Sequence, residues 1–233
     1  MNRIIFNGKS SSEYGLYVSG EGTFNSPELD TISYSIPGRS GDIIVSNKRY
    51  KNVLVKYPAF IRANFKANAA KVRAWLLQPQ GYCRLEDSYH PDEFRLAKFS
   101  GPLDFEMRFL NQSGTCELLF DCKPQRFLTS GEDPVDMEAG AVLINPTLFY
   151  ALPLIKISGT GAGTITVGQQ TVSFSDIDEY VILDCDSQNA YKGLENKNST
   201  MTGAFPELAP GENIISWDGD LTAVEITPRW WTV

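Results

Sequence analysis

The chain has 233 residues, of which 42% are hydrophobic, 12% aromatic and 21% charged, a composition typical of a soluble globular protein. No apolar run approaches the roughly 18 residues that indicate a transmembrane helix, and the first residues hold no apolar signal-peptide core. We therefore expect a protein without membrane insertion that is made in a cytoplasm and forms one large or two ordinary domains.

The net charge of −7 is unevenly distributed along the chain. Residues 1–130 carry 17 Lys and Arg against 13 Asp and Glu, whereas residues 131–233 carry 4 against 15. Such an abrupt change indicates two domains with different surfaces. The acidic second half argues against nucleic-acid binding there, and the small basic excess of the first half does not suggest it on its own.

The first domain, over residues 1–130, is expected to be mainly β with one helix. Short β-prone runs precede the stretch SIPGRSGDIIV, in which Pro37 and Gly38 indicate a turn between strands. The stretch NAAKVRAWLLQPQGY predicts the helix over about residues 68–78, with Asn68 as its N-cap and Pro79 after its end. We expect its apolar stripe to pack on the domain's own sheet rather than in a partner's groove.

Strand-like segments follow the helix and predict a continuing antiparallel sheet. They lie over residues 82–89, 93–101, 102–110 and 114–122. Residues 131–140, rich in acidic residues with Pro and Gly, are the expected linker. From residue 141 onward, short β runs at fairly regular spacing predict a second domain that is a β-sandwich or barrel.

SIPGRSGDIIV resembles a phosphate loop at first sight, but its spacing excludes that function. Gly38 and Gly41 are three residues apart, no Lys follows, and the chain continues as a strand rather than a helix. The dinucleotide fingerprint fails as well, because no βαβ unit surrounds the stretch. Arg39, at the tip of this turn, could contact a neighbouring subunit or could simply be solvated.

The remaining polar residues provide no recognisable catalytic or metal site. His90 is the only histidine, and beside Pro91 it is expected to be a solvated loop residue rather than part of a catalytic triad. Cys83, Cys116, Cys122 and Cys185 form no CxxC motif and are expected to be reduced, mostly buried thiols.

Two acidic groups could in principle act as paired carboxylates or bind calcium. We expect solvated strand ends and turns instead. The groups are Asp176, Asp178 and Glu179, and Asp184 with Asp186.

Tryptophans provide the basis for an alternative function. Trp217, Trp230 and Trp231 lie in the second half, and an exposed tryptophan can stack on a sugar ring. Strand alternation puts Trp230 and Trp231 on opposite faces, so at most one of them is expected in the core.

Nearly the whole chain resembles the distal tail proteins of bacteriophages with long, non-contractile tails. Motifs in the family's order carry this resemblance. They are FNGKSSSEYGLYVSG, IPGRSGDI, RYKN, VKYP, AAKVRAWLLQPQGYCRLEDSYHPDEFRLA, LLFDCKPQRFLTSG, NPTLFYALPLIKISGTG, YVILDCDSQNAY and FPELAPGENIISWDG.

The resemblance implies a structural virion protein of the tail tip. Its N-terminal β-sandwich or split-barrel domain would form a hexameric ring hub whose channel lets DNA pass, and its C-terminal domain would be a galectin-like β-sandwich. The implied partners are the protein itself, the major tail tube protein, and tape-measure and baseplate or receptor-binding proteins, after assembly in the host cytoplasm. No enzyme activity, cofactor, metal or specific nucleic-acid binding is implied. A module that binds cell-wall sugars is the alternative.

Overall fold

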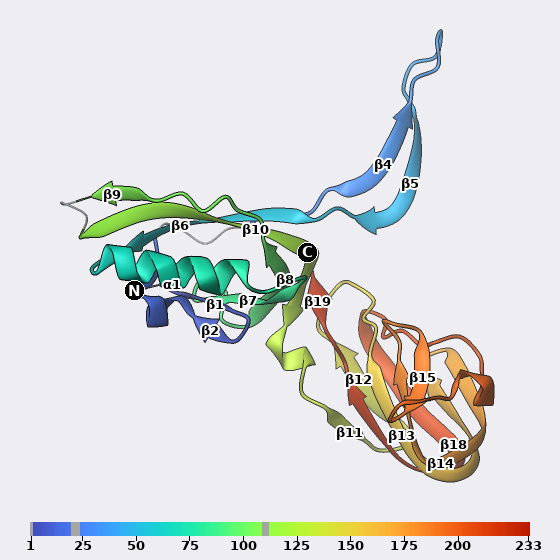
Figure 1. Ribbon diagram of the computed structural model, residues 1–233. Helices are drawn as coiled ribbons and strands as arrows, with labels where there is room; N and C mark the ends of the chain where they lie inside the picture. Colours follow the sequence, from blue (N-terminus) through green and yellow to red (C-terminus); the bar gives the residue numbers. More distant parts are fainter. Residues whose placement is uncertain (1, 20–23, 109–111) are drawn as a thin grey trace. The chain divides into compact units, whose positions relative to one another are not determined.

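The structure is a computed structural model that describes residues 2–19, 24–108 and 112–233. The chain divides into two compact units, residues 1–126 with Val233, and residues 127–232. Both units are built on antiparallel sheets, and the described residues contain one α-helix, so the expected mainly β class is confirmed (Figure 1).

The first unit is a curled sheet with the order β2-β1-β7-β8-β10-β6-β3. An antiparallel bridge joins Asn2, which precedes β1, to Val18 of β3. A strand β9 pairs with β10 at one end of the sheet. The strands are β1 (Ile4–Phe6), β2 (Lys9–Ser10), β3 (Leu16–Val18), β6 (Val53–Ile61), β7 (Cys83–Asp87), β8 (Glu93–Phe99), β9 (Glu106–Arg108) and β10 (Ser113–Leu128), with a 3-10 turn at Ser11–Tyr14.

The sheet encloses a core made by strand alternation. In β6, every second residue from Val53 to Ile61 is buried, and the residues between them face outward. Aromatic rings fill the interior: Phe120 of β10 makes edge-to-face contacts with Phe6, Tyr57 and Phe99. These three rings come from β1, β6 and β8, so one side chain joins distant parts of the sequence.

Helix α1 (Phe65–Leu77) packs on this sheet, as expected from its apolar stripe. Its buried residues are Phe65, Ala69, Val72, Trp75 and Leu76. The Trp75 indole N–H donates to the carbonyl of Phe6 at 3.1 Å, which ties the helix to β1. The expected N-cap was wrong: the cap is Asn64 with φ 52°, and Asn68 lies inside the helix, donating to the Ala63 carbonyl.

The segment expected as a strand over 102–110 is regular only at β9, and residues 109–110 lie outside the described residues. The predicted segments 82–89, 93–101 and 114–122 correspond to β7, β8 and β10.

Strands β4 (Leu29–Tyr34) and β5 (Ile43–Tyr50) form a separate two-stranded sheet. β5 leads into β6 through Lys51 and Asn52. In Figure 1 the pair extends away from the other strands of its unit. We call β4, β5 and the turn between them, residues 29–50, the arm.

The second unit has a sheet with the order β11-β18-β13-β14-β15-β16, with β12 also paired to β18 and β17 to β14. The expectation of uniformly short strands was wrong for three of them, because β13, β14 and β18 run for 14, 15 and 17 residues. The strands are β11 (Val135–Met137), β12 (Ala141–Asn145), β13 (Leu154–Val167), β14 (Gln170–Asp184), β15 (Asn189–Lys192), β16 (Glu195–Asn196), β17 (Met201–Thr202), β18 (Gly211–Thr227) and β19 (Trp231–Thr232), with 3-10 turns at Thr129–Gly131 and Asn198–Thr200.

Shifts in strand register, of the kind caused by β-bulges, allow these long strands to bend. The register of β13 shifts between Gly161 and Gly163 against β14, and between Gly159 and Gly163 against β18. Gly161 has φ 118°, a backbone conformation that residues with a side chain rarely adopt, so glycine is favoured here. The bend encloses a core that includes Ile157, Ile165 and Val224.

Candidate interaction surface

The tip of the arm is a tight turn of the kind that its sequence predicts. The Arg39 N–H donates to the Ile36 carbonyl at 3.2 Å, and Gly38 has φ 81°. Pro37 and Gly38 therefore occupy the central positions of a type II turn, where proline presets φ and glycine accepts a positive φ. Arg39 is exposed at this tip. Its predicted contact with a neighbouring subunit stays a prediction.

The base of the arm is held by charge pairs between its strands. Arg49 Nε donates to Asp30 Oδ2 at 2.7 Å, and Lys51 Nζ lies 3.3 Å from Glu28 Oε2. The hydrogen bond from Arg49 is the main reason why the pKa of Asp30 lies below its usual value. Exposed pairs of this kind contribute little stability, so they hold the base of the arm only weakly.

The two faces of the arm differ sharply in chemistry. Tyr34 lies opposite Ile43, and Ile32 lies opposite Val45, so these four side chains share one face. We call it the apolar face of the arm. The other face carries the opposite pairs Thr31 with Ser46 and Ser33 with Ile44, and is therefore mostly hydroxyl groups.

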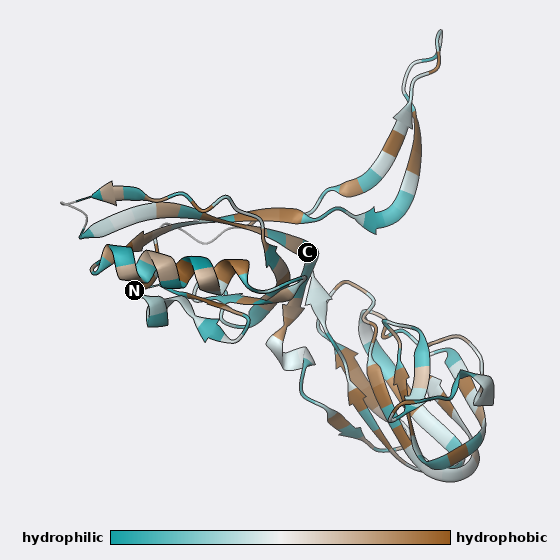
Figure 2. Ribbon diagram, in the orientation of Figure 1, coloured by the Kyte–Doolittle hydropathy of each residue, from teal (hydrophilic) through white to brown (hydrophobic). Residues whose placement is uncertain are grey.

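The apolar face of the arm is uncovered. Its four side chains are 42–54% exposed, although isoleucine, valine and tyrosine are usually buried when they share a strand face. Figure 2 shows hydrophobic residues along both strands of the arm. An isolated two-stranded hairpin is marginally stable in water and needs another surface to pack against. The arm is therefore a candidate interaction surface.

Sequence reasoning located the turn but missed the apolar face. The signal was present in TISYSI, where Ile32, Tyr34 and Ile36 alternate with Thr31, Ser33 and Ser35. Alternation alone, however, does not say whether the chain itself covers the apolar side.

The residues considered for catalysis are engaged in structural contacts. The expectation of a solvated His90 was wrong: its side chain is 17% exposed, and its Nδ1 lies 3.1 Å from Asp87 Oδ1. The thiols are free, and burial raises the pKa of Cys116, Cys122 and Cys185 to about 12, so they are poor nucleophiles near neutral pH.

Three of the five acidic residues considered for a site in the second unit pair with cations. Arg229 Nη1 lies 2.6 Å from Asp184 Oδ1. Burial alone would raise the pKa of Asp184, but the hydrogen bond and charge of Arg229 outweigh it and lower the value. Lys192 Nζ lies 3.0 Å from Asp178 and 3.3 Å from Glu179.

The positions of these acids differ partly from the expectation. Asp176, Asp178 and Glu179 lie within β14, not at a strand end or turn, and Asp186 follows β14. Among the described residues, no group of three or more His, Cys, Asp or Glu side chains could hold a metal ion.

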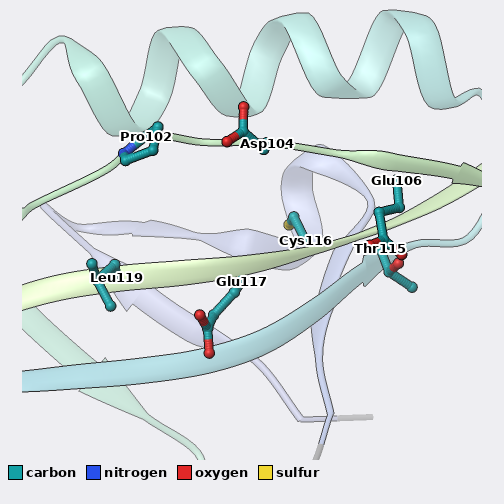
Figure 3. Close-up of a pocket in the computed structure, with 7 residues that line it drawn as sticks. All are labelled: Pro102, Asp104, Glu106, Thr115, Cys116, Glu117 and Leu119. Carbon is teal, nitrogen blue, oxygen red and sulfur yellow. The ribbon is translucent and has the colours of Figure 1, made fainter.

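A cleft of about 470 Å³ in the first unit also fails to assemble a catalytic pair. Its lining comes from β10, β9 and the segment before β9: Pro102, Asp104, Glu106, Thr115, Cys116, Glu117 and Leu119. In Figure 3, Asp104 and Glu117 point away from each other. Glu117 instead faces Lys56 at 3.7 Å on the neighbouring strand.

The three tryptophans occupy different environments. Trp230 is 5% exposed and belongs to the core of the second unit, so it is not available for stacking on a sugar. Trp217 and Trp231 are half-buried. The Trp231 ring lies 4.6 Å from that of Phe149, and its N–H donates to the Tyr150 carbonyl. A sugar contact at Trp217 or Trp231 stays a prediction.

Within the described residues, no helix is long and apolar enough to cross a membrane.

Comparison with known proteins gives structural matches without sequence matches. No protein-family model and no curated protein matches this chain. The structure of SPP1 Dit, a hub protein of the adsorption apparatus of phages that infect Gram-positive bacteria, matches with a TM-score of 0.77 at 11% identity, over 100% of both chains.

Two structures of the phage p2 baseplate in its activated conformation, one with Sr and one with Ca, match less closely. Their TM-scores are 0.50 and 0.51, at 10% and 9% identity, over 97% of both chains. At these identities the matches concern the fold. The family resemblance read from the sequence is thus confirmed at that level: this chain has the fold of the phage tail-hub protein Dit along its entire length.

Proposed function

We propose that this protein is a structural subunit of a phage tail tip that assembles with copies of itself into a hexameric ring hub. The observation that carries the proposal is the uncovered apolar face of the arm, on a chain whose fold matches a phage hub protein from end to end. Apolar surface of this kind is stabilised when another protein surface removes it from water.

The occupant of the apolar face is a second copy of this chain. A contact between two different surfaces of identical subunits repeats around an axis and closes into a ring when the rotation permits. The arm is suited to this role, because it carries the apolar face away from its own core and ends in the exposed Arg39. In the proposed ring Arg39 contacts the neighbouring subunit.

The ring joins the tail tube to the baseplate or tail tip, and DNA passes through its channel. The small basic excess of residues 1–130, 17 Lys and Arg against 13 Asp and Glu, supports passage without tight binding, since a DNA-binding channel would need a strongly basic surface. The proposed partners are the major tail tube protein, tape-measure protein, and baseplate or receptor-binding proteins. Assembly in the host cytoplasm and location in the virion belong to the same proposal, and no enzymatic step is part of it.

Light scattering coupled to size separation, followed by negative-stain images, tests the proposal. Six copies of the 25.9 kDa chain make a particle of about 155 kDa, and two stacked rings twice that. We expect one of these masses and a central hole. A mass of one chain at every concentration up to about 100 μM would contradict self-assembly, because a stable protein contact forms well below it.

A further inference from the structure

A polar cavity adjoins the apolar core of the first unit, since the core residues Tyr57 and Leu85 form part of its lining. Its volume is about 10 Å³, counted as the space open to the centre of a water molecule. That is room for one water molecule or one ion of similar size. Its polar lining comes from β6, β7, β8, β10 and the turn after β7: Tyr57, Asp87, His90, Glu93, Arg95 and Arg126.

Arg95 is placed in this cavity by the pleat of β8. It lies on the same face as Ala97, which is fully buried, and directly opposite Leu85 of β7. The Arg95 side chain is consequently drawn into the interior, and the residue is 8% exposed. A buried charge is stable in a protein only when an opposite charge or hydrogen-bond acceptors compensate it.

The described residues supply no such acceptor to the end of this side chain. Arg95 Nη1 and Nη2 are both buried without a hydrogen-bond partner. Burial, and after it the positive charge of Arg126, lower the pKa of Arg95. A guanidinium nevertheless keeps its proton in proteins, so the charge must be compensated rather than removed.

The carboxylates that line the cavity have other partners. Asp87 Oδ1 accepts the backbone N–H groups of Tyr89 and His90 at 2.9 Å and lies 3.1 Å from His90 Nδ1. Asp87 Oδ2 accepts the Tyr57 hydroxyl at 2.7 Å. Glu93 Oε2 lies 3.5 Å from Arg126 Nη1. The lining thus has two carboxylates, Asp87 and Glu93, and two guanidinium groups. Neither carboxylate forms an ion pair with Arg95.

We propose that this cavity binds one small monovalent anion of the halide class, held by the two terminal N–H groups of Arg95. An anion compensates the buried charge of Arg95 and reduces its repulsion with Arg126, whereas a neutral water molecule would satisfy only the hydrogen bonds. The bound ion links β8 to β10 through the two guanidinium groups. It therefore stabilises the polar end of the first unit, and with it the folded state.

Bromide provides a direct test, because it resembles chloride in size and is visible by anomalous X-ray scattering. Crystals of the full chain grown in sodium bromide are expected to show an anomalous peak within hydrogen-bonding distance of Arg95 Nη1 and Nη2. An ordinary water peak there without anomalous signal, bridging Arg95 to the unpaired His90 Nε2, would overturn the proposal. An empty cavity would overturn it as well.

A matched pair of variants tests the same site in solution. Replacing chloride by gluconate, which is too large for the cavity, at constant ionic strength should lower the melting temperature of the wild type. Each tenfold rise in chloride concentration above the dissociation constant of the site should raise the melting temperature by about 3–5 °C.

Arg95→Met is expected to lose this dependence, while Arg62→Met, which removes an exposed arginine of the same unit, keeps it. Equal chloride dependence in Arg95→Met and the wild type would refute the assignment. If Arg95→Met fails to fold, the bromide experiment on the wild type still decides.

Discussion

Two consecutive strands, β5 and β6, show how similar patterns lead to opposite environments. In β6 every second residue from Val53 to Ile61 points to one side and is at most 6% exposed. In β5, only two residues earlier in the chain, Ile43 and Val45 also share one side but are 42% and 46% exposed. Alternation of apolar and polar residues identifies the side of a strand that needs to be buried. It does not identify the surface that buries this side, which for β6 is the core of its own unit.

The largest contrast between these environments is expected in thiol reactivity. Burial raises the pKa of Cys122, which pairs with Val53 at the start of β6, to about 12. A cysteine at an exposed position has an ordinary pKa near 8.5, so its thiolate fraction is higher by roughly a thousandfold. In a dilute sample we therefore expect Val45→Cys to be alkylated at least that much faster than Cys122, as followed by peptide mass spectrometry.

Repeating the labelling at a protein concentration high enough for assembly tests whether a second copy covers the arm. In the assembled protein the apolar face of the arm is covered, so labelling of Val45→Cys should slow while that of Cys122 stays unchanged. Slow labelling of Val45→Cys in the dilute monomer would mean that the chain covers its own arm.

Truncating an apolar side chain to alanine should reduce the free energy of unfolding more in β6 than in β5. Ile61→Ala, at a fully buried position of β6, is expected to lower the free energy of unfolding by about 2–5 kcal/mol because it leaves a cavity. Ile43→Ala, on the arm, should change it by less than about 0.5 kcal/mol. Urea unfolding at concentrations below assembly measures both, and comparable losses would show that the arm belongs to the folding core.

A smaller effect is expected for a half-covered charge pair in the second unit. Because Arg229 lowers the pKa of Asp184, the pair adds stability above the unfolded carboxyl pKa of about 3.9 and loses it as the pH falls through the lower folded value. Arg229→Met should therefore cost below about 1 kcal/mol at pH 7 and less at pH 2–3.

The control for this charge pair is Lys192→Met. Its carboxylate partners Asp178 and Glu179 are more exposed than Asp184, and this substitution should cost less at pH 7. Urea unfolding at both pH values measures the two variants. A loss for Arg229→Met that is independent of pH would assign the effect to packing instead of charge.

The sequence was sufficient for features that depend on local chemistry. Pro37 and Gly38 predicted a turn because their backbone preferences match its two central positions. The stripe from Ala69 to Leu76 predicted a helix on its own sheet. The predicted start of that helix was wrong: Asn68 is a chemically suitable cap, but the helix begins one turn earlier, at the buried Phe65.

Features that depend on contacts between distant parts of the chain could not be predicted from the sequence. Arg95, in the strand-like run EFRLAKF, differs in no local way from an exposed strand residue, and its burial follows from its place on the inner face of β8 with Ala97. His90 was expected in solvent because Pro91 marks a loop, yet Asp87 draws it inward. The uncovered state of the arm's apolar face was not predictable for a related reason, because alternation does not show whether another part of the chain covers it.

The most direct test of the account is the mass of two double variants that differ only in the face they change. Ile32→Glu with Val45→Lys places an ion pair across the apolar face of the arm, and Thr31→Glu with Ser46→Lys places the same pair across the other face. By light scattering, the first variant is predicted to have the mass of one chain and the second that of the assembled ring. Assembly of the first variant, or equal loss of assembly in both, would contradict the claim that the apolar face of the arm binds a second copy.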